Sequence, residues 1–147
     1  MQTTLILLKP DTVERSLIGK VIARLENKWL KIVWLKMMQL DDSIIEEHYD
    51  FLADKPFFPS IKSYMKRTPV VALAVTGQNA IATVRTLTGA TNPAEALPGS
   101  IRGDFGLTID GNIIHASDSE ENAKIELNRF FKWENIFDYT KIIDIVL

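Results

Sequence analysis

His115 is one of two histidines in the chain, and it stands where a side chain could do chemistry. It ends an expected short strand over residues 112–115 and precedes an expected helix from Ser119 to about Phe131. A side chain at such a place is exposed on a rigid frame, beside backbone N–H groups that favour an anion. A histidine at a strand end is nevertheless more often structural when taken alone, so its claim to chemistry depends on its neighbours.

Glu126 is the most informative of these neighbours. Ala123, Leu127 and Phe130 form the inward-facing stripe of the expected helix, and Glu126 borders that stripe. A carboxylate near a core needs a partner, and His115 lies at the other end of the same strand–helix unit. A carboxylate that accepts a hydrogen bond from one imidazole nitrogen fixes the tautomer and leaves the other nitrogen free to attack. The spacing alone slightly favours an ordinary charge on the helix surface.

His48 is the competing histidine. It lies in the run E-E-H-Y, four residues after Ile44 and four before Leu52, on the apolar face of an expected helix. This position favours a packed histidine over a catalytic one.

Three basic residues, Lys9, Arg85 and Arg102, each adjoin a break in the expected structure: a strand end, a helix end and an irregular loop. Lys and Arg on helix faces are usually solvated, but basic groups at element ends could form a clamp for a polyphosphate. The glycine-rich loops that cradle phosphates in other folds, G-x-x-x-x-G-K-[ST] and G-x-G-x-x-G, are absent from the sequence. A nucleotide would therefore be held here by side chains.

Phe57 and Phe58 form an aromatic pair between Pro56 and Pro59. One ring is expected to anchor in the core, as is usual for such a pair. The other could stack on a nucleotide base.

The composition of the chain excludes several kinds of site and partner. The 147 residues fit a single domain, 1–147, and the absence of cysteine excludes disulfides, thiolate metal sites and a cysteine nucleophile. A net charge of −2 gives no global attraction to nucleic acid, so no specific nucleic-acid partner is expected. The apolar run before Lys9 is too short for a signal sequence or a membrane span, so we expect a cytoplasmic protein without a membrane partner.

The order of the expected elements predicts an α+β fold. Short apolar runs predict strands, and helical spacing predicts helices between them. The strands are expected over residues 3–8, 31–40, 69–75 and 112–115, and the helices over 17–29, 42–49, 57–66, 78–87 and 119–131. Residues 88–111 show little periodicity, and so long an irregular stretch is usually functional. The arrangement favours a ferredoxin-like βαββαβ sandwich, in which helices cover one face of a mainly antiparallel four-stranded sheet.

Short polar residues suggest where these helices begin. Ser16 is the expected N-cap of the first helix, and Asp42 or Ser43 that of the second. Ser117 and Glu120 have the spacing of a capping box at the start of the last helix.

The chain resembles the nucleoside diphosphate kinases from end to end. The matching stretches are K-P-D-T-V-E-R (9–15), H-Y (48–49), P-F-F-P (56–59), T-P-V-V-A (68–72), T-N-P-A (91–94), P-G-S-I-R-G-D-F (98–105) and N-I-I-H-A-S-D-S (112–119). The last two are highly specific. Thr12, Thr68 and Ala116 stand where many members of the family have glycine, and none of these replacements removes a catalytic group.

The resemblance implies a role for each matching residue. It implies a ping-pong transfer of the γ-phosphoryl group from a nucleoside triphosphate to a nucleoside diphosphate, through a phosphohistidine on His115. Glu126 would orient this histidine, Ser117 would hydrogen-bond Glu126, and Tyr49 would lie beside the histidine. Phe57 would stack on the base. The implied ligands of the ribose and phosphates are Lys9, Arg85, Thr91, Arg102 and Asn112.

The resemblance also implies a cofactor and an assembly. Mg²⁺ would be bound mainly by the nucleotide phosphates, with Asp118 near it through water. The family forms homo-oligomers, and the apolar tail that ends at Leu147 favours a hexamer over a tetramer, because such a tail fits against a neighbouring subunit.

Two other readings are open to the sequence. An RNA-recognition or small-molecule regulatory domain could share this fold, but the aromatic K/R-G-F motifs and the basic face of an RNA-recognition domain are absent. An inactive member of the family would have lost His115, Lys9 or Arg102, and all three are present.

Overall fold

The computed structural model, in which residues 1–132 and 136–146 are described, contains a four-stranded sheet. Its strands are β1 (Gln2–Leu8), β2 (Lys31–Met38), β3 (Val70–Gly77) and β4 (Ile114–Ala116). They lie in the order β2-β3-β1-β4, and each neighbouring pair is antiparallel. The predicted α+β architecture with an antiparallel sheet is therefore confirmed.

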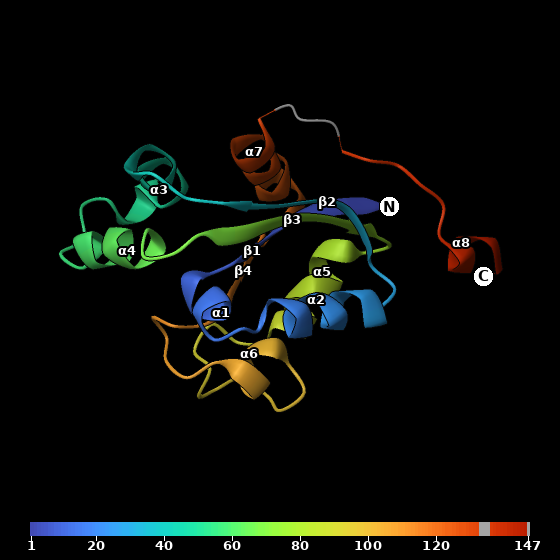
Figure 1. The fold of residues 1–147 in the computed structure, drawn as a ribbon, viewed down its shortest axis with the longest axis horizontal. Helices are drawn as coiled ribbons and strands as arrows, with labels where there is room; N and C mark the ends of the chain where they lie inside the picture. The colour runs from blue at the N-terminus through green and yellow to red at the C-terminus, as the bar shows by residue number, and fades with distance from the viewer. Residues whose placement is uncertain (133–135, 147) are drawn as a thin grey trace.

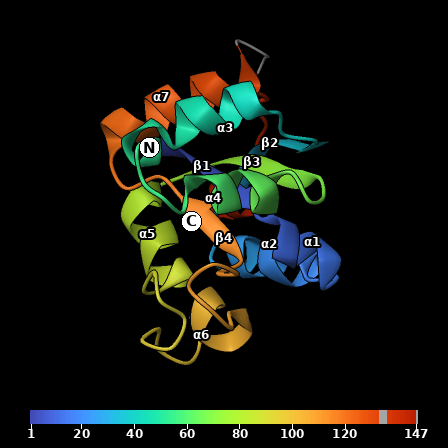
Figure 2. The same ribbon diagram turned by 90° about the vertical axis from the view of Figure 1, so that its left-hand side faces the viewer.

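Helices cover both faces of this sheet, so the expectation of helices on one face is wrong. The helices α2 (Ile18–Asn27) and α5 (Ala80–Thr88) lie on one face, and α3 (Asp42–His48) and α7 (Glu120–Phe131) on the other (Figures 1 and 2). Successive side chains of a strand point to opposite faces. The central strand β1 thus sends Ile6 and Leu8 into one apolar cluster and Leu5 and Leu7 into another, and each cluster needs its own cover.

Short helices connect these elements. They are α1 (Pro10–Glu14), the 3₁₀ turn η1 (Asp50–Leu52), α4 (Phe58–Met65), α6 (Ile101–Phe105) and α8 (Ile142–Val146). The sequence predicted neither α1 nor α6, because five residues are too few to show helical periodicity. Pro10 occupies the first turn of α1, where a missing N–H costs nothing. Ser100 begins α6 by accepting a hydrogen bond from Gly103 N at 3.0 Å, so the segment 88–111 is partly helical.

The predicted helix caps are corrected by the structure. Ser16 has a φ of 56° and does not cap α2, whose N-cap position is Leu17. Asp41 caps α3 by accepting from Ile44 N at 3.0 Å. Ser119 caps α7, so Ser117 and Glu120 form no capping box. The last two errors have one cause, since several adjacent Ser and Asp residues could each have served as the cap.

The C-terminal segment returns along the edge strand β2. Phe137 N donates a hydrogen bond to Val33 O at 2.9 Å. The segment ends in α8, whose Ile142, Ile145 and Val146 are exposed, and Leu147 lies outside the described residues. Within the described residues, no helix is both long enough and apolar enough to cross a membrane.

Candidate functional site

β4 and α7 bring His115 and Glu126 together. His115 is the middle residue of β4, where it pairs with Leu7 of the central strand, and Glu126 lies on α7. The Nε2 atom of His115 lies 2.9 Å from Oε2 of Glu126. The buried Ser117 donates its hydroxyl to the same oxygen at 2.6 Å. The contact expected from the position of Glu126 beside the helix stripe is present.

This contact fixes which nitrogen of His115 carries the proton. Burial alone would raise the pKa of Glu126, but the hydrogen bonds from His115 and Ser117 outweigh it, so the pKa lies below its usual value. An ionised carboxylate only accepts hydrogen bonds. Nε2 of His115 must therefore be the N–H donor, and Nδ1 bears the lone pair with which an imidazole attacks.

His48 packs behind this pair. It is buried, and its ring meets the rings of His115 and Tyr49 edge-on, each with a centroid distance of 4.7 Å. Burial and the neighbouring His115 lower the pKa of His48 to about 3. Its Nδ1 lies 2.9 Å from Nη1 of Arg129, and an arginine can only donate, so Nδ1 accepts. His48 is thus a neutral, packed histidine, as its position in the sequence favours.

Tyr49 lies one ring away from His115. Its ring contacts are with His48 and Phe51. Burial raises the pKa of Tyr49 to about 12, and the charge of Glu126 adds to the effect, so the hydroxyl stays protonated.

Lys9 and Asn112 meet at the end of β1. Lys9 Nζ donates to Asn112 Oδ1 at 2.7 Å, and the amide nitrogen of Asn112 donates to the carbonyl of Thr91 at 3.0 Å. Burial lowers the pKa of Lys9 to about 8, and the nearby charge of Arg102 adds to this effect. The lowered pKa means that the positive charge of Lys9 is destabilised by burial, and a bound anion would stabilise it.

Arg85 and Arg102 differ in their burial and in their hydrogen bonds, which the sequence did not predict. Arg102 is 4% exposed and donates to three carbonyls: Asn112 O at 3.1 Å, Gly89 O at 3.2 Å and Ile114 O at 2.5 Å. Burial lowers its pKa to about 10, and the charge of Arg85 contributes. Arg85 is exposed and makes one longer bond, from Nη1 to Ala116 O at 3.3 Å. Arg102 therefore supports the backbone around His115 as well as adding charge.

The aromatic pair divides as expected. Phe58 is buried, whereas Phe57 is 50% exposed at the start of α4. One ring is thus an anchor and the other is free to meet a ligand.

Asp118 is exposed and accepts a hydrogen bond from the side chain of Asn122 at 2.6 Å. In the part of the chain that is described, no group of three or more His, Cys, Asp or Glu residues could hold a metal ion.

The three positions at which the family often has glycine show no need for it. Thr12, Thr68 and Ala116 are not among the residues with positive φ. Their side chains are therefore accommodated without backbone strain.

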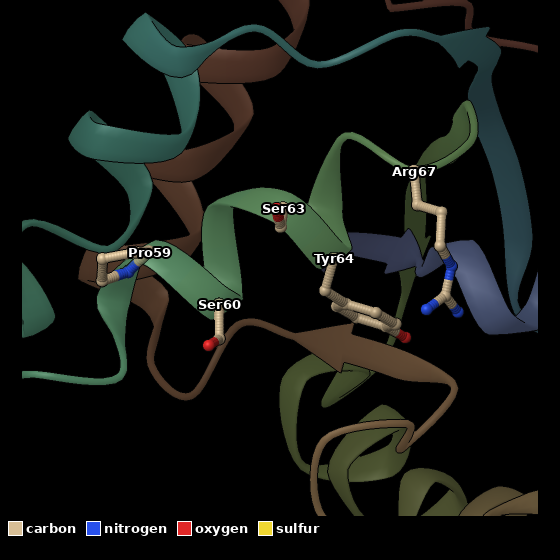
Figure 3. Close-up of a pocket in the computed structure, with 5 residues that line it drawn as sticks. All are labelled: Pro59, Ser60, Ser63, Tyr64 and Arg67. Atoms are coloured by element: carbon tan, nitrogen blue, oxygen red, sulfur yellow. The ribbon is translucent and has the colours of Figure 1, made fainter.

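One part of the surface near this site was missed by the sequence analysis. A hollow of about 620 Å³ is lined by Pro59, Ser60, Ser63, Tyr64 and Arg67. In Figure 3 the side chains of Ser60, Tyr64 and Arg67 point to the same side of α4. Ser60 and Tyr64 are four residues apart, which is the spacing of one helix face, and this signal could have revealed them; Arg67 follows the end of the helix. Tyr64 reaches the body of the protein, because its hydroxyl donates to Oδ1 of Asp11.

The arrangement can support a phosphoryl transfer. It provides an imidazole nitrogen that bears a lone pair, a carboxylate that fixes the ring, and three cationic side chains on adjoining elements. Such a transfer depends on positioning and charge neutralisation more than on other covalent chemistry.

Comparison with known proteins agrees with this geometry. The sequence model of the family described as nucleoside diphosphate kinase matches residues 2–136. A nucleoside diphosphate kinase of Roseiflexus castenholzii is 50% identical over 144 residues, which cover 98% of this chain and 97% of that protein. One of Archaeoglobus fulgidus is 50% identical over 141 residues, 96% of this chain and 93% of its own length. The structure of a halophilic nucleoside diphosphate kinase from Halobacterium salinarum in complex with CDP superposes with a TM-score of 0.94 at 39% identity, covering 99% of this chain and 97% of that one. The chain therefore belongs to the nucleoside diphosphate kinase family and is a phosphotransferase of that class.

Proposed function

We propose that the chain passes the γ-phosphoryl group of a nucleoside triphosphate to a nucleoside diphosphate through Nδ1 of His115. In the first half-reaction Nδ1 forms a bond to the γ-phosphorus, and the bond from that phosphorus to the β–γ bridging oxygen breaks. The nucleoside diphosphate leaves with the electron pair of the broken bond. In the second half-reaction a terminal phosphate oxygen of another nucleoside diphosphate attacks the phosphohistidine and restores the free imidazole. The hydrogen bond between His115 and Glu126 is the observation that carries this proposal.

The surrounding residues support binding of the nucleotide. Phe57 offers an exposed ring to the base, and stacking accepts any base because every base has a π-face. The ribose and phosphates would be held by Lys9 and Asn112 at the end of β1, and by Arg85, Thr91 and Arg102. The Halobacterium relative holds CDP, which supports a nucleoside diphosphate as the ligand.

Mg²⁺ is the cofactor that this chemistry requires. Bound to the phosphates of the nucleotide, it would neutralise charge on the oxygens of the transferring group. We infer that Asp118, which is exposed beside the start of α7, would meet this ion through water. We further infer a cytoplasmic homo-oligomer and favour a hexamer, because α8 leaves Ile142, Ile145 and Val146 exposed for a neighbouring subunit.

The transfer is tested with a labelled nucleotide. The protein is incubated with Mg²⁺ and ATP labelled in the γ-phosphate, and then chased with GDP. We expect a label on the protein that is labile in acid and stable in base, and that moves to GTP during the chase. Formation of labelled GTP without any labelled protein would show direct transfer and overturn the proposal.

Replacing Glu126 with glutamine should slow phosphorylation of His115 by about 10²-fold or more, as occurs when a histidine is held in the wrong tautomer. The amide can donate to Nε2, which would place the proton on Nδ1. Rapid-quench measurement of a single turnover at saturating ATP gives the rate. Glu121→Gln is the matched control, since Glu121 is exposed on the same helix, and it should react at the wild-type rate. An unchanged rate in Glu126→Gln would rule out the orienting role.

Nucleotide affinity should fall as the pH rises above about 8. The pKa of Lys9 in the free protein is lowered to about 8, and a bound phosphate would raise it again. Below pH 7 Lys9 is charged in both states and contributes no pH dependence. Above pH 8 binding must take up a proton, so affinity should fall by up to about tenfold per pH unit.

Calorimetric titration with ADP and Mg²⁺ measures this effect directly. Experiments at pH 9 in two buffers with different ionisation enthalpies should show proton uptake. The Lys9→Arg variant stays charged, so its proton uptake should be lost. Equal proton uptake in the two proteins would assign the effect to another group.

A further inference from the structure

Ile113, two residues before His115, has a backbone that its side chain disfavours. Its φ is 72°, and Ile114 N donates to Asn112 O at 2.8 Å, which closes a three-residue γ-turn around it. Among the described non-glycine residues with positive φ, it is the only β-branched one. A β-branched residue in this region is strained, and such strain persists only where neighbouring groups enforce it.

The groups that enforce this turn come from the start of α1. Asp11 Oδ2 accepts a hydrogen bond from Ile113 N at 3.1 Å. Thr12 Oγ1 donates to Ile113 O at 2.6 Å, and Lys9 N donates to the same carbonyl at 2.8 Å. Both polar groups of the strained peptide are therefore held, and the side chains of Asp11 and Thr12 are buried.

Asp11 also links the turn to α4. Its second carboxylate oxygen accepts the hydroxyl of Tyr64, and α4 begins next to the exposed ring of Phe57. A bidentate pair between Arg67 and Glu14, with distances of 2.6 and 2.8 Å, joins the same two regions. The carboxylate of Asp11 thus joins the turn that precedes His115 to α4, the helix that follows Phe57.

The turn sets the direction of two residues of the proposed site. Asn112, the first residue of the turn, holds Lys9, and His115 follows one residue after the turn's last, Ile114. If Ile113 relaxed to negative φ, the peptide planes on both sides would rotate and shift these two side chains. A displacement of about 1 Å at a reacting group can cost about 10²-fold in rate.

We propose that Asp11 and Thr12 are positioning residues for phosphoryl transfer: together they hold Ile113 in the left-handed conformation that aligns Asn112 and His115 with the nucleotide. This inference rests on the proposed function, since alignment matters only if His115 is the phosphate carrier. Neither residue contacts the phosphate in this role. A glycine, which the family usually has at this position, could not supply the hydroxyl of Thr12.

The test uses two substitutions of nearly equal size at position 11. Tyr64→Phe is introduced first, so that Asp11 has no hydroxyl to accept. In this background Asp11→Asn keeps an oxygen for Ile113 N–H, whereas Asp11→Leu has none. We expect Asp11→Asn to form phosphohistidine within about threefold of the background rate, and Asp11→Leu to be slower by about tenfold or more at saturating ATP.

A spectroscopic measurement separates positioning from stability. The amide proton resonance of Ile113 should move upfield in Asp11→Leu and stay in place in Asp11→Asn, at a temperature far below unfolding. Equal single-turnover rates in the two variants, with Ile113 shifted in only one, would overturn the inference. Failure of the wild-type protein to form phosphohistidine would instead overturn the proposed function.

Thr12 provides a second test, independent of whether Asp11→Leu folds. Thr12→Val removes the hydroxyl and keeps the shape, and Thr12→Ser keeps the hydroxyl. We expect Thr12→Val to be slower than wild type by about threefold and Thr12→Ser to match it, since Lys9 N still holds the carbonyl. Equal rates in these two variants would remove Thr12 from the inference.

Discussion

Replacing His115 with glutamine is expected to abolish the phosphoenzyme and to lower the rate of transfer between nucleotides by about 10⁴-fold or more, the scale on which loss of a covalent nucleophile acts in other enzymes. The glutamine side chain can still fit among the groups that surround the imidazole. Its amide has no nitrogen lone pair able to attack phosphorus. Steady-state transfer from ATP to GDP and intact-protein mass after incubation with ATP measure the two effects.

His48→Gln is the matched control for this substitution, because His48 is the second histidine of the chain. It is buried behind His115 and accepts from Arg129, and a glutamine oxygen can also accept that bond. We expect this variant to become phosphorylated. A phosphoenzyme that survived in His115→Gln and disappeared in His48→Gln would reverse the assignment of the two histidines.

Replacing Arg102 with methionine is expected to lower the free energy of unfolding by about 2–4 kcal/mol. The carbonyls of Gly89 and Ile114 lose the donor that Arg102 supplies, and each unsatisfied buried acceptor costs about 1–3 kcal/mol. The carbonyl of Asn112 also loses a hydrogen bond but keeps the one from Ile114 N. Removal of a buried charge offsets part of this cost. Urea unfolding monitored by circular dichroism gives the free energy, and a large loss of phosphoryl transfer should accompany it.

Arg85→Met is the control for this second prediction. Arg85 is exposed and makes a single bond of 3.3 Å, so its loss should change the free energy of unfolding by less than about 0.5 kcal/mol. Nucleotide affinity should nevertheless fall, since one cationic group is removed from the phosphates. If the two variants lost equal stability, the structural role of Arg102 would be refuted.

The sheet was predictable from the sequence because each strand shows as an apolar run of a few consecutive residues. The apolar run of β1 shows that both faces of the strand are buried, and Pro69 stands just before β3, where a missing N–H is tolerated. The same run also implied cover on both faces, which the prediction of helices on one face overlooked. Periodicity could not reveal α1 or α6, because each has five residues.

The site was predictable only in part. The position of Glu126 beside the inward stripe of its helix indicated a partner, and the structure supplies His115 at 2.9 Å. The burial of Arg102 could not be predicted, since its three acceptors are backbone carbonyls. Every residue has such a carbonyl, so the residue type does not show which ones an arginine will bind. The strain at Ile113 was equally hidden, because nothing about an isoleucine suggests a positive φ.

Identifying which nitrogen of His115 carries the phosphate is the most direct test of the proposed transfer through Nδ1. The phosphoenzyme can be hydrolysed in strong base, which spares phosphohistidine, and the two isomers separated beside synthetic standards. Because Glu126 holds Nε2 at 2.9 Å, all of the phosphate should be on Nδ1. Phosphate on Nε2, or on a residue other than histidine, would contradict the proposed mechanism.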